Sequence, residues 1–393
     1  MLTCKVQGLI TKTMRTKLYQ TPHSKYAWVL GLLLITSYSA LAQLSGNYTI
    51  DPTQSASSSN YRNWTSAITD MRSGTRTDGG TAQGSGISGP VVFTVYDTVY
   101  KEQLYIQSIS GASYTNTITF QSKGKDSTQC LLEVASGTIA GADYVVAFNG
   151  AQYVKFNQIG MLRTGNGTYS SVIELNANCD KISITNCWLK GRKVPSNSST
   201  GFNYGPGSII HFAGNSDSTE IINNKMIYGY NGIYGAVSCT ANRIIGNVID
   251  TSGSSGVYMT QQSSLEITGN TFNMGDFGPS TGHYTSYGCR IESSPGMLIN
   301  KNKIYMLATN GQVVRAIILA NTTSTAANPT RVNNNRIMNG GGTGSCTGLA
   351  VYNCRFVDFY YNNILVTNSL KDGSSYYHYA NYTNTNINLV NNI

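Results

Sequence analysis

Five side chains that can contact a sugar recur through the central part of the chain at intervals of 23 to 37 residues. They are an acid, an imidazole, two phenols and a guanidinium: Glu174, His211, Tyr234, Tyr258 and Arg290. Each directly follows an apolar residue in a short β-prone segment, and successive side chains of a strand point to opposite faces. If the apolar residues point inward, these five point outward. Aromatic rings flanked by charged groups suit a sugar chain, so these five residues are candidates for a glycan-binding stripe, while an ordinary solvated outer face is the favoured interpretation.

The same alternation extends the stripe to Ile318, Ala350 and His378, and it places Glu292 on the same face as Arg290. Arg290 and Glu292 are therefore the candidate catalytic residues of a polysaccharide lyase or a glycoside hydrolase. A lyase needs an acid cluster that holds Ca²⁺ and a basic residue, and a hydrolase needs two neighbouring carboxylates. The chain has only 18 acids and no Asp-Asp or Asp-x-Asp sequence. A structural, adhesive or glycan-binding role without catalysis is therefore favoured, and polysaccharide cleavage is the alternative.

Nothing in the sequence predicts a metal or a cofactor. The histidines after residue 42 are His211, His283 and His378, and no two stand at the spacing of a metal site. The chain contains no CxxC pair, HExxH motif or phosphate-binding loop. The seven cysteines after residue 42 are scattered, as is typical of small interior residues. Only Cys179–Cys187 and Cys346–Cys354 are close enough in sequence to suggest a bridge.

The elements that position the stripe are indicated by a recurring asparagine, which returns every 23 to 38 residues. Its positions are Asn157, Asn186, Asn224, Asn247, Asn270, Asn302, Asn335, Asn363 and Asn392. Most of these asparagines follow a β-rich stretch and precede an apolar residue. Self-similarity at this period indicates a solenoid. The asparagine either adopts the left-handed conformation at a tight turn or points inward, where its amide bonds the next coil. Both roles are structural.

Three short strands per repeat, joined by turns of variable length, predict an all-β fold: a right-handed parallel β-helix. The regular coils are expected over 151–393. Residues 43–150 are expected to form an N-terminal cap and the first irregular coils. A short helix at Asn63–Arg72 places Trp64, Ile68 and Met71 on one face, which would cover the apolar end of the first coil. A separate small domain is the alternative for this segment.

Residues 1–42 have the pattern of an export signal, with five basic residues, an apolar run over Trp28–Ile35 and the small-residue site Ala40-Leu41-Ala42. The alternative is a transmembrane anchor. Without this segment the 27 basic residues become 22 against 18 acids, so no nucleic-acid partner is expected. No later stretch is apolar enough to span a membrane.

The sequence stops at the recurring asparagine motif itself, Asn391-Asn392-Ile393, where a strand should continue. We therefore expect a longer natural protein or a truncated product.

Three further segments resemble the start of large bacterial surface proteins within the secreted right-handed β-helix group of the pectate-lyase-like superfold. They are Gly89-Pro90-Val91-Val92-Phe93, Tyr100-Lys101-Glu102-Gln103 and Asn116-Thr117-Ile118-Thr119-Phe120-Gln121-Ser122. The resemblance covers about residues 45–393 and implies export by a type IX route, Ig-like modules and a C-terminal sorting domain. This sequence departs from the pattern by lacking the sorting domain. The expected protein is secreted or cell-surface, with a structural, adhesive or glycan-binding role and a polysaccharide or cell-surface glycan as its partner.

Overall fold

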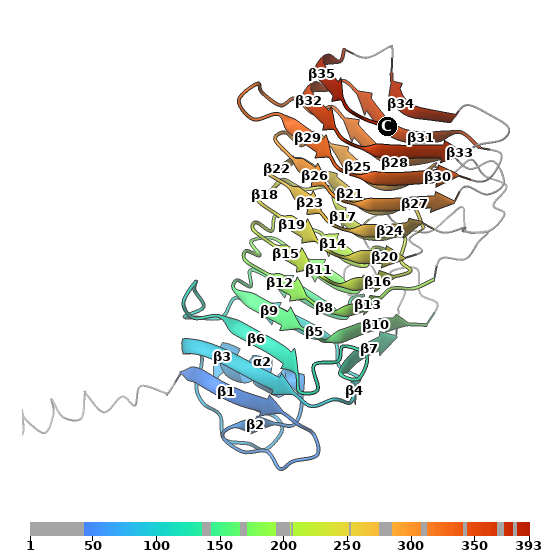
Figure 1. Ribbon diagram of the computed structural model, residues 1–393. Helices are drawn as coiled ribbons and strands as arrows, with labels where there is room; N and C mark the ends of the chain where they lie inside the picture. Colours follow the sequence, from blue (N-terminus) through green and yellow to red (C-terminus); the bar gives the residue numbers. More distant parts are fainter. Residues whose placement is uncertain are drawn as a thin grey trace, which may run out of the picture. The chain divides into compact units, whose positions relative to one another are not determined.

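The computed structural model describes residues 43–135, 143–165, 171–193, 205, 207–250, 253–274, 285–307, 313–340, 344–367, 373–379 and 383–393. The expected export signal over 1–42 and His283 lie outside these residues. Within them, three long parallel sheets and one small pair of strands account for nearly all regular structure. Figure 1 shows the strands stacked in columns, with sheets A and B in front of sheet C.

Sheet A has 13 strands. In spatial order they are β2 (Asn60–Tyr61), β1 (Leu44–Ile50), β3 (Ile87–Val95), β6 (Ile118–Ser122), β9 (Val154–Asn157), β12 (Ser183–Thr185), β15 (Glu220–Ile222), β19 (Arg243–Ile245), β23 (Glu266–Thr268), β26 (Leu298–Asn300), β29 (Thr330–Asn333), β32 (Arg355–Tyr360) and β35 (Thr385–Val390).

Sheets B and C have 10 strands each. Sheet B contains β4 (Val99–Tyr100), β7 (Leu131–Ala135), β10 (Gly160–Thr164), β13 (Trp188–Lys190), β16 (Lys225–Ile227), β20 (Val248–Asp250), β24 (Thr271–Met274), β27 (Lys303–Leu307), β30 (Arg336–Gly340) and β33 (Asn363–Thr367). Sheet C contains β5 (Leu104–Gln107), β8 (Val146–Asn149), β11 (Ile173–Leu175), β14 (Ile210–Phe212), β17 (Asn231–Gly235), β21 (Ser255–Thr260), β25 (Thr285–Glu292), β28 (Val313–Ala320), β31 (Cys346–Tyr352) and β34 (Gly373–His378).

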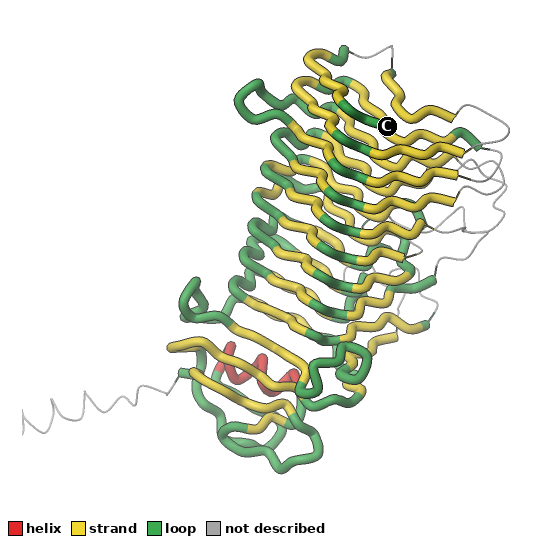
Figure 2. Tube along the Cα trace, viewed as in Figure 1, coloured by secondary structure: helices red, strands yellow, loops and turns green. Residues whose placement is uncertain are grey.

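From β3 onward the chain visits the three long sheets in the order A, B, C, so each circuit is one coil of three strands (Figure 2). Every strand pairs in parallel with its counterpart one coil away, as β11 does with β8 and β14. A short extra pair, β18 (Cys239–Thr240) with β22 (Gln262–Ser263), joins two turns between sheets C and A. The all-β parallel β-helix predicted from the sequence is therefore confirmed.

The one helix of the described residues, α2 (Trp64–Ser73), packs at the N-terminal end of the core. Asn63 caps it by accepting a hydrogen bond from the Ser66 backbone N–H at 2.8 Å. The Trp64 ring is fully buried and stacks on Phe156 with ring centroids 5.8 Å apart. The helix thus covers apolar side chains of the first coils, as the spacing of its apolar residues predicts.

An asparagine ladder runs between sheets A and B through seven successive coils. Its members are Asn224, Asn247, Asn270, Asn302, Asn335, Asn362 and Asn392. In each step the Nδ2 amide donates to the Oδ1 of the next coil at 2.8–3.0 Å. The same Oδ1 atom also accepts the backbone N–H of the earlier asparagine. The ladder side chains therefore point inward and link neighbouring coils.

The left-handed residue of each ladder turn is the one before the asparagine, as at Gly246 and Gly269. This register corrects the assignment of Asn363. It also places Asn157 and Asn186, which bond each other through their side chains at 2.9 Å, outside the inward ladder. Asn363 lies exposed at the start of β33, and Asn362 takes the ladder position. Asn186 is itself the left-handed residue, with φ of 55°, and Asn157 ends β9. In those two coils the ladder position is occupied by Cys187 and Ile159, respectively.

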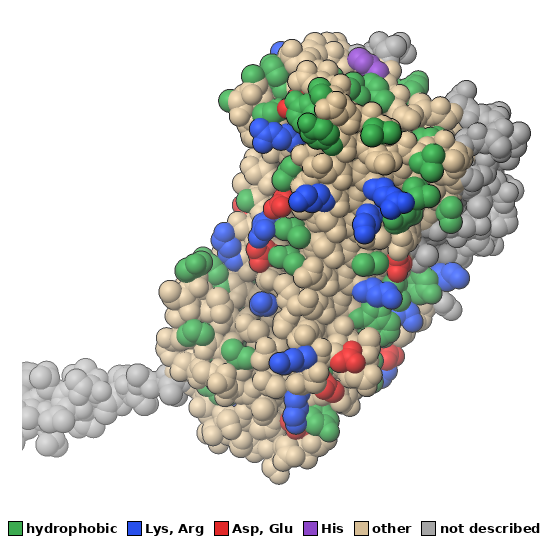
Figure 3. All heavy atoms as spheres, viewed as in Figure 1, with side chains coloured by type: hydrophobic (Ala, Val, Ile, Leu, Met, Phe, Trp, Pro, Cys, Tyr) green, Lys and Arg blue, Asp and Glu red, His purple; other side chains and the backbone are tan. Residues whose placement is uncertain are grey.

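The seven cysteines of the described residues are all buried and free, so neither close pair forms a bridge. No described helix is long and apolar enough to cross a membrane. Lys and Arg side chains are spread across the face formed by sheets A and B and do not gather in one patch (Figure 3).

Candidate functional site

The structure places the five residues of the expected stripe in one row on the outer face of sheet C. Direct pairs along the row are Glu174–His211, His211–Tyr234, Tyr234–Tyr258 and Tyr258–Arg290, on β11, β14, β17, β21 and β25. At about 4.8 Å per strand, the four intervals span roughly 19 Å. The residues that precede them are completely buried in the core, as the alternation requires: Ile173, Ile210, Ile233, Val257 and Cys289.

The row is longer than the sequence pattern indicated. Before Glu174 it continues through Ala147 on β8 to Tyr105 on β5. After Arg290 it continues through Ile318 and Ala350, as expected, and its next member is Tyr377. His378 pairs with Val351 instead and lies outside the row. The extrapolation failed at this end because β34 carries two adjacent tyrosines, Tyr376 and Tyr377, before His378, so apolar and polar residues do not alternate there.

Aromatic and cationic groups contact one another along the middle of the row. The His211 and Tyr234 rings have centroids 5.8 Å apart, and the Tyr234 and Tyr258 rings meet edge to face at 5.2 Å. The Arg290 guanidinium carbon lies 4.4 Å from the centroid of the Tyr258 ring and 5.0 Å from that of Tyr287. Cation–π contacts of this length hold the guanidinium in place between the two rings.

A pocket of about 170 Å³ opens beside Arg290. Its lining residues are Tyr287, Arg290, Glu292, Arg315, Ile318, Tyr352 and Tyr379. The Glu292 carboxylate accepts a hydrogen bond from Arg290 Nε at 2.7 Å, and the same oxygen, Oε1, forms an ion pair with Arg290 Nη2 at 2.6 Å. Across the pocket the Tyr352 and Tyr379 rings meet at 5.8 Å. The pocket therefore combines aromatic walls with a charged pair.

Four lining residues were missed by the sequence analysis: Tyr287, Arg315, Tyr352 and Tyr379. A signal for two of them was present. Tyr352 and Tyr379 each stand two residues after a member of the row, which is the position of Glu292 relative to Arg290. Extending the outward face by one position on every strand would have found them. Tyr287 and Arg315 lie on the other side of Arg290, where β25 and β28 begin.

The N-terminal end of the predicted stripe holds two ionisable groups, the buried Glu174 and the partly buried His211. Burial raises the pKa of Glu174 to about 7 and lowers that of His211 to about 4. Glu174 is 8% exposed, and Nδ1 of His211 has no hydrogen-bond partner in the described part of the chain. Gly205 lies against the imidazole, where any added Cβ would overlap the ring. Near pH 7 this end therefore carries a partly protonated carboxyl beside a neutral imidazole.

The pKa of Glu174 makes a testable contribution to stability. Between pH 4.5, the ordinary pKa of a glutamate, and about pH 7, Glu174 keeps its proton in the folded state but has lost it in the unfolded state. Stability from this group is therefore lost as pH rises through that window. The loss in free energy of unfolding is about 3 kcal/mol, at 1.36 kcal/mol per pKa unit, and replacing Glu174 with Gln should remove it. Urea unfolding of the wild type and the variant at several pH values in this range measures the difference. His211 makes stability rise with pH, but it does so in both proteins and cancels in the comparison. Parallel profiles would contradict the assignment.

The carboxylates of the row are too far apart to act together. Glu174 and Glu292 are separated by four strand spacings, or about 19 Å, whereas paired carboxylates of glycosidases stand about 5–9.5 Å apart. Glu292 is instead paired with Arg290. No group of three or more metal-ligating side chains occurs among the residues that the structure describes. The arrangement can stack on and hydrogen-bond a ligand along the row.

Known proteins were compared with this chain by sequence and by structure. Residues 208–393 match the family model described as "Right handed beta helix region", which confirms the right-handed sense of the coil. No curated protein matches the sequence.

Similar solved structures include a lacto-N-biosidase of family GH136 from Eubacterium ramulus, at 8% identity and a TM-score of 0.46, covering 93% of this chain and 71% of that one. A pectin methylesterase in complex with a hexasaccharide is 8% identical, with a TM-score of 0.37 and coverage of 78% and 90%. The surface protein and adhesin PfbA from Streptococcus pneumoniae is 13% identical, with a TM-score of 0.36 and coverage of 77% and 92%.

Proposed function

On this right-handed parallel β-helix, we propose that the outer face of sheet C binds a polysaccharide chain, so that the protein acts as a carbohydrate-binding or adhesive protein. The observation that carries the proposal is the Arg290 guanidinium, stacked between Tyr258 and Tyr287 and oriented by Glu292 at the rim of a pocket. The export pattern of residues 1–42 supports a secreted or cell-surface location, where such a ligand is met.

The geometry suits an extended ligand because equivalent side chains repeat along the solenoid axis. Tyrosine rings offer apolar faces to the C–H face of a sugar ring while their hydroxyls reach its edge. Arginine has five N–H donors in a rigid fork, and Glu292 accepts a hydrogen bond from Nε and forms an ion pair with Nη2. The guanidinium is thus held in one orientation before the ligand arrives, which lowers the entropic cost of binding.

Removing the aromatic and cationic centre of the row should weaken binding by at least about tenfold. The variant is Tyr258→Ala with Arg290→Ala, and the loss of one stacked ring and one cation–π partner is worth about 1–3 kcal/mol. A glycan array first identifies the ligand, and retention on an insoluble form of it then measures affinity. The matched control is Tyr305→Ala with Arg336→Ala on sheet B, which should bind normally. A wild-type protein that binds no glycan, or a control that loses binding equally, would contradict the proposal.

A second candidate function is polysaccharide cleavage, which one observation favours. The pKa of Glu174 near 7 would let its carboxyl group donate a proton at neutral pH, as a general acid must. Incubation with pectin, alginate and glycosaminoglycans, followed by assays for unsaturated product and for reducing ends, tests this function. Cleavage by the wild type that is lost in Glu174→Gln or Arg290→Ala would establish this second function. If the wild type cleaves none of these polysaccharides, binding remains the proposed function.

A further inference from the structure

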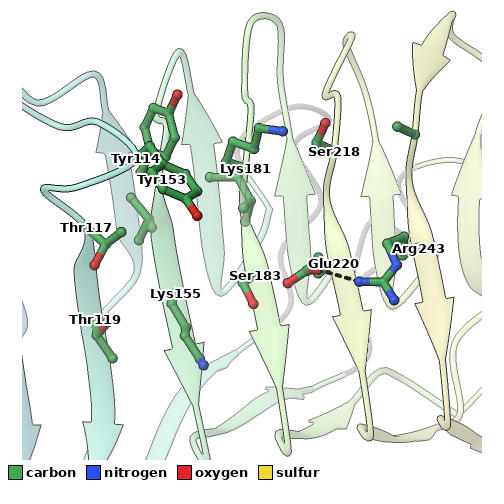
Figure 4. Close-up of a pocket in the computed structure, with 13 residues that line it drawn as sticks. Tyr114, Thr117, Thr119, Tyr153, Lys155, Lys181, Ser183, Ser218, Glu220 and Arg243 are labelled. Carbon is green, nitrogen blue, oxygen red and sulfur yellow. Dashed lines mark hydrogen bonds and ion pairs between the residues drawn. The ribbon is translucent and has the colours of Figure 1, made fainter.

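A second concave surface lies on sheet A, away from the row on sheet C (Figure 4). Its volume is about 520 Å³, within the range of about 300–1,000 Å³ that is usual for ligand sites. Its floor is an in-register row across five strands, β6, β9, β12, β15 and β19. The row consists of Thr119, Lys155, Ser183, Glu220 and Arg243. We call this surface the sheet A groove.

One wall of the groove is made by turn residues, one per coil, that precede the strands of the floor. Tyr153, Lys181, Ser218 and Ala241 all adopt the left-handed conformation, with φ between 52° and 58°. Tyr114 closes the end near β6 and is 85% exposed. Figure 4 shows Tyr114 and Tyr153 at the same end and the Glu220–Arg243 pair at the other. The groove therefore has an aromatic end and a charged floor.

The positive charge of the groove is only partly compensated. Arg243 is held on both sides, by Glu220 at 2.8 Å and by Glu266 at 3.1 Å. Lys155 and Lys181, which belong to consecutive coils, take part in no ion pair within the described ranges. Two ammonium groups thus line the groove without an ion pair of their own, together with the exposed Tyr114 and the partly buried Tyr153.

We propose that the sheet A groove binds a sparsely sulfated oligosaccharide. Tyr114 and Tyr153 would stack on a sugar ring, and the hydroxyls of the floor would meet the sugar hydroxyls. The two ammonium groups would pair with sulfate esters. An arginine binds a planar carboxylate through its two-pronged guanidinium, but the one arginine of the groove, Arg243, is already paired with Glu220 and Glu266. A lysine ammonium acts as a point charge, which suits the oxygens of a tetrahedral sulfate. Because the groove offers only two such ammonium groups, we expect an oligosaccharide with few sulfate esters.

The test compares a sulfated oligosaccharide with the same chain without sulfate and with a carboxylated chain of a different sugar. A κ-carrageenan oligosaccharide, its desulfated form and an oligogalacturonate are titrated into the full chain by calorimetry at two salt concentrations. We expect the sulfated form to bind, the other two to bind at least about tenfold more weakly, and added salt to weaken the complex. No binding, equal binding of the desulfated form, or preference for the carboxylated chain would overturn the proposal.

Variants then place the site on sheet A. Lys155→Gln with Lys181→Gln should lower affinity at least about tenfold, and Tyr114→Ala should also weaken binding. The matched control, Lys225→Gln with Lys303→Gln, removes the same charge from exposed positions on sheet B and should bind as the wild type does.

The variants of the two surfaces keep the two proposals separate. Tyr258→Ala with Arg290→Ala should leave binding of the sulfated oligosaccharide unchanged, because those residues lie on sheet C. If that sheet C variant abolishes sulfated-oligosaccharide binding and the lysine variant does not, the groove is not the site. Thermal melting of each variant verifies that it is folded, so that a loss of affinity reports on the contact itself.

Discussion

Replacing Asn270 with alanine should destabilise the protein by about 3–5 kcal/mol. Asn270 is completely buried, and its Oδ1 accepts from the backbone N–H and the Nδ2 of Asn247. Its own Nδ2 donates to the Ile244 carbonyl at 2.8 Å and to Asn302 Oδ1 at 3.0 Å. Alanine would leave these partners buried without a hydrogen bond, at about 1–3 kcal/mol for each group that finds no other. Urea unfolding followed by circular dichroism measures the loss.

Asn363→Ala is the matched control for this experiment. Asn363 has the same side chain and stands next to the ladder residue Asn362, but it is exposed at the start of β33. Its removal should change stability by less than about 0.5 kcal/mol, as is usual for exposed sites. If both variants lose the same stability, the ladder hydrogen bonds contribute little to the fold.

Replacing Trp64 with alanine should cost about 3–5 kcal/mol, the usual range for removing a buried large aromatic side chain. The ring has no exposed surface, and it packs against Tyr100, Phe120 and Phe156 at centroid distances of 6.0, 5.0 and 5.8 Å. Its loss would also uncover apolar side chains at the end of the coil, so we expect the variant to self-associate. Thermal melting and size-exclusion chromatography measure the two effects.

The control for Trp64 is Trp188→Ala on β13, where the indole is only partly buried. We expect a loss of about 1 kcal/mol and no change in elution volume. A Trp64 variant that melts and elutes like the Trp188 variant would show that α2 does not protect the core end.

The coil register was readable from the sequence because strand side chains alternate with a period of two. Once Ile210 and Ile233 are assigned to the core, His211 and Tyr234 must point outward and lie beside each other, as they do. The ladder was less readable. Asn362 and Asn363 are adjacent and chemically identical, and the left-handed residue of that turn is Tyr361, against its intrinsic preference. Local propensity therefore did not identify which asparagine points inward.

The sequence by itself determined the solenoid, its inward and outward faces, and the row from Glu174 to Arg290, because these follow from periodicity alone. Only the tertiary structure decided which groups surround them. The pocket beside Arg290 joins Tyr287 to Tyr379, and the sheet A groove joins Tyr114 to Arg243. The burial that raises the pKa of Glu174 likewise depends on neighbouring coils. Such contacts join residues many positions apart, and side-chain direction across coils is set by packing, which no local pattern encodes.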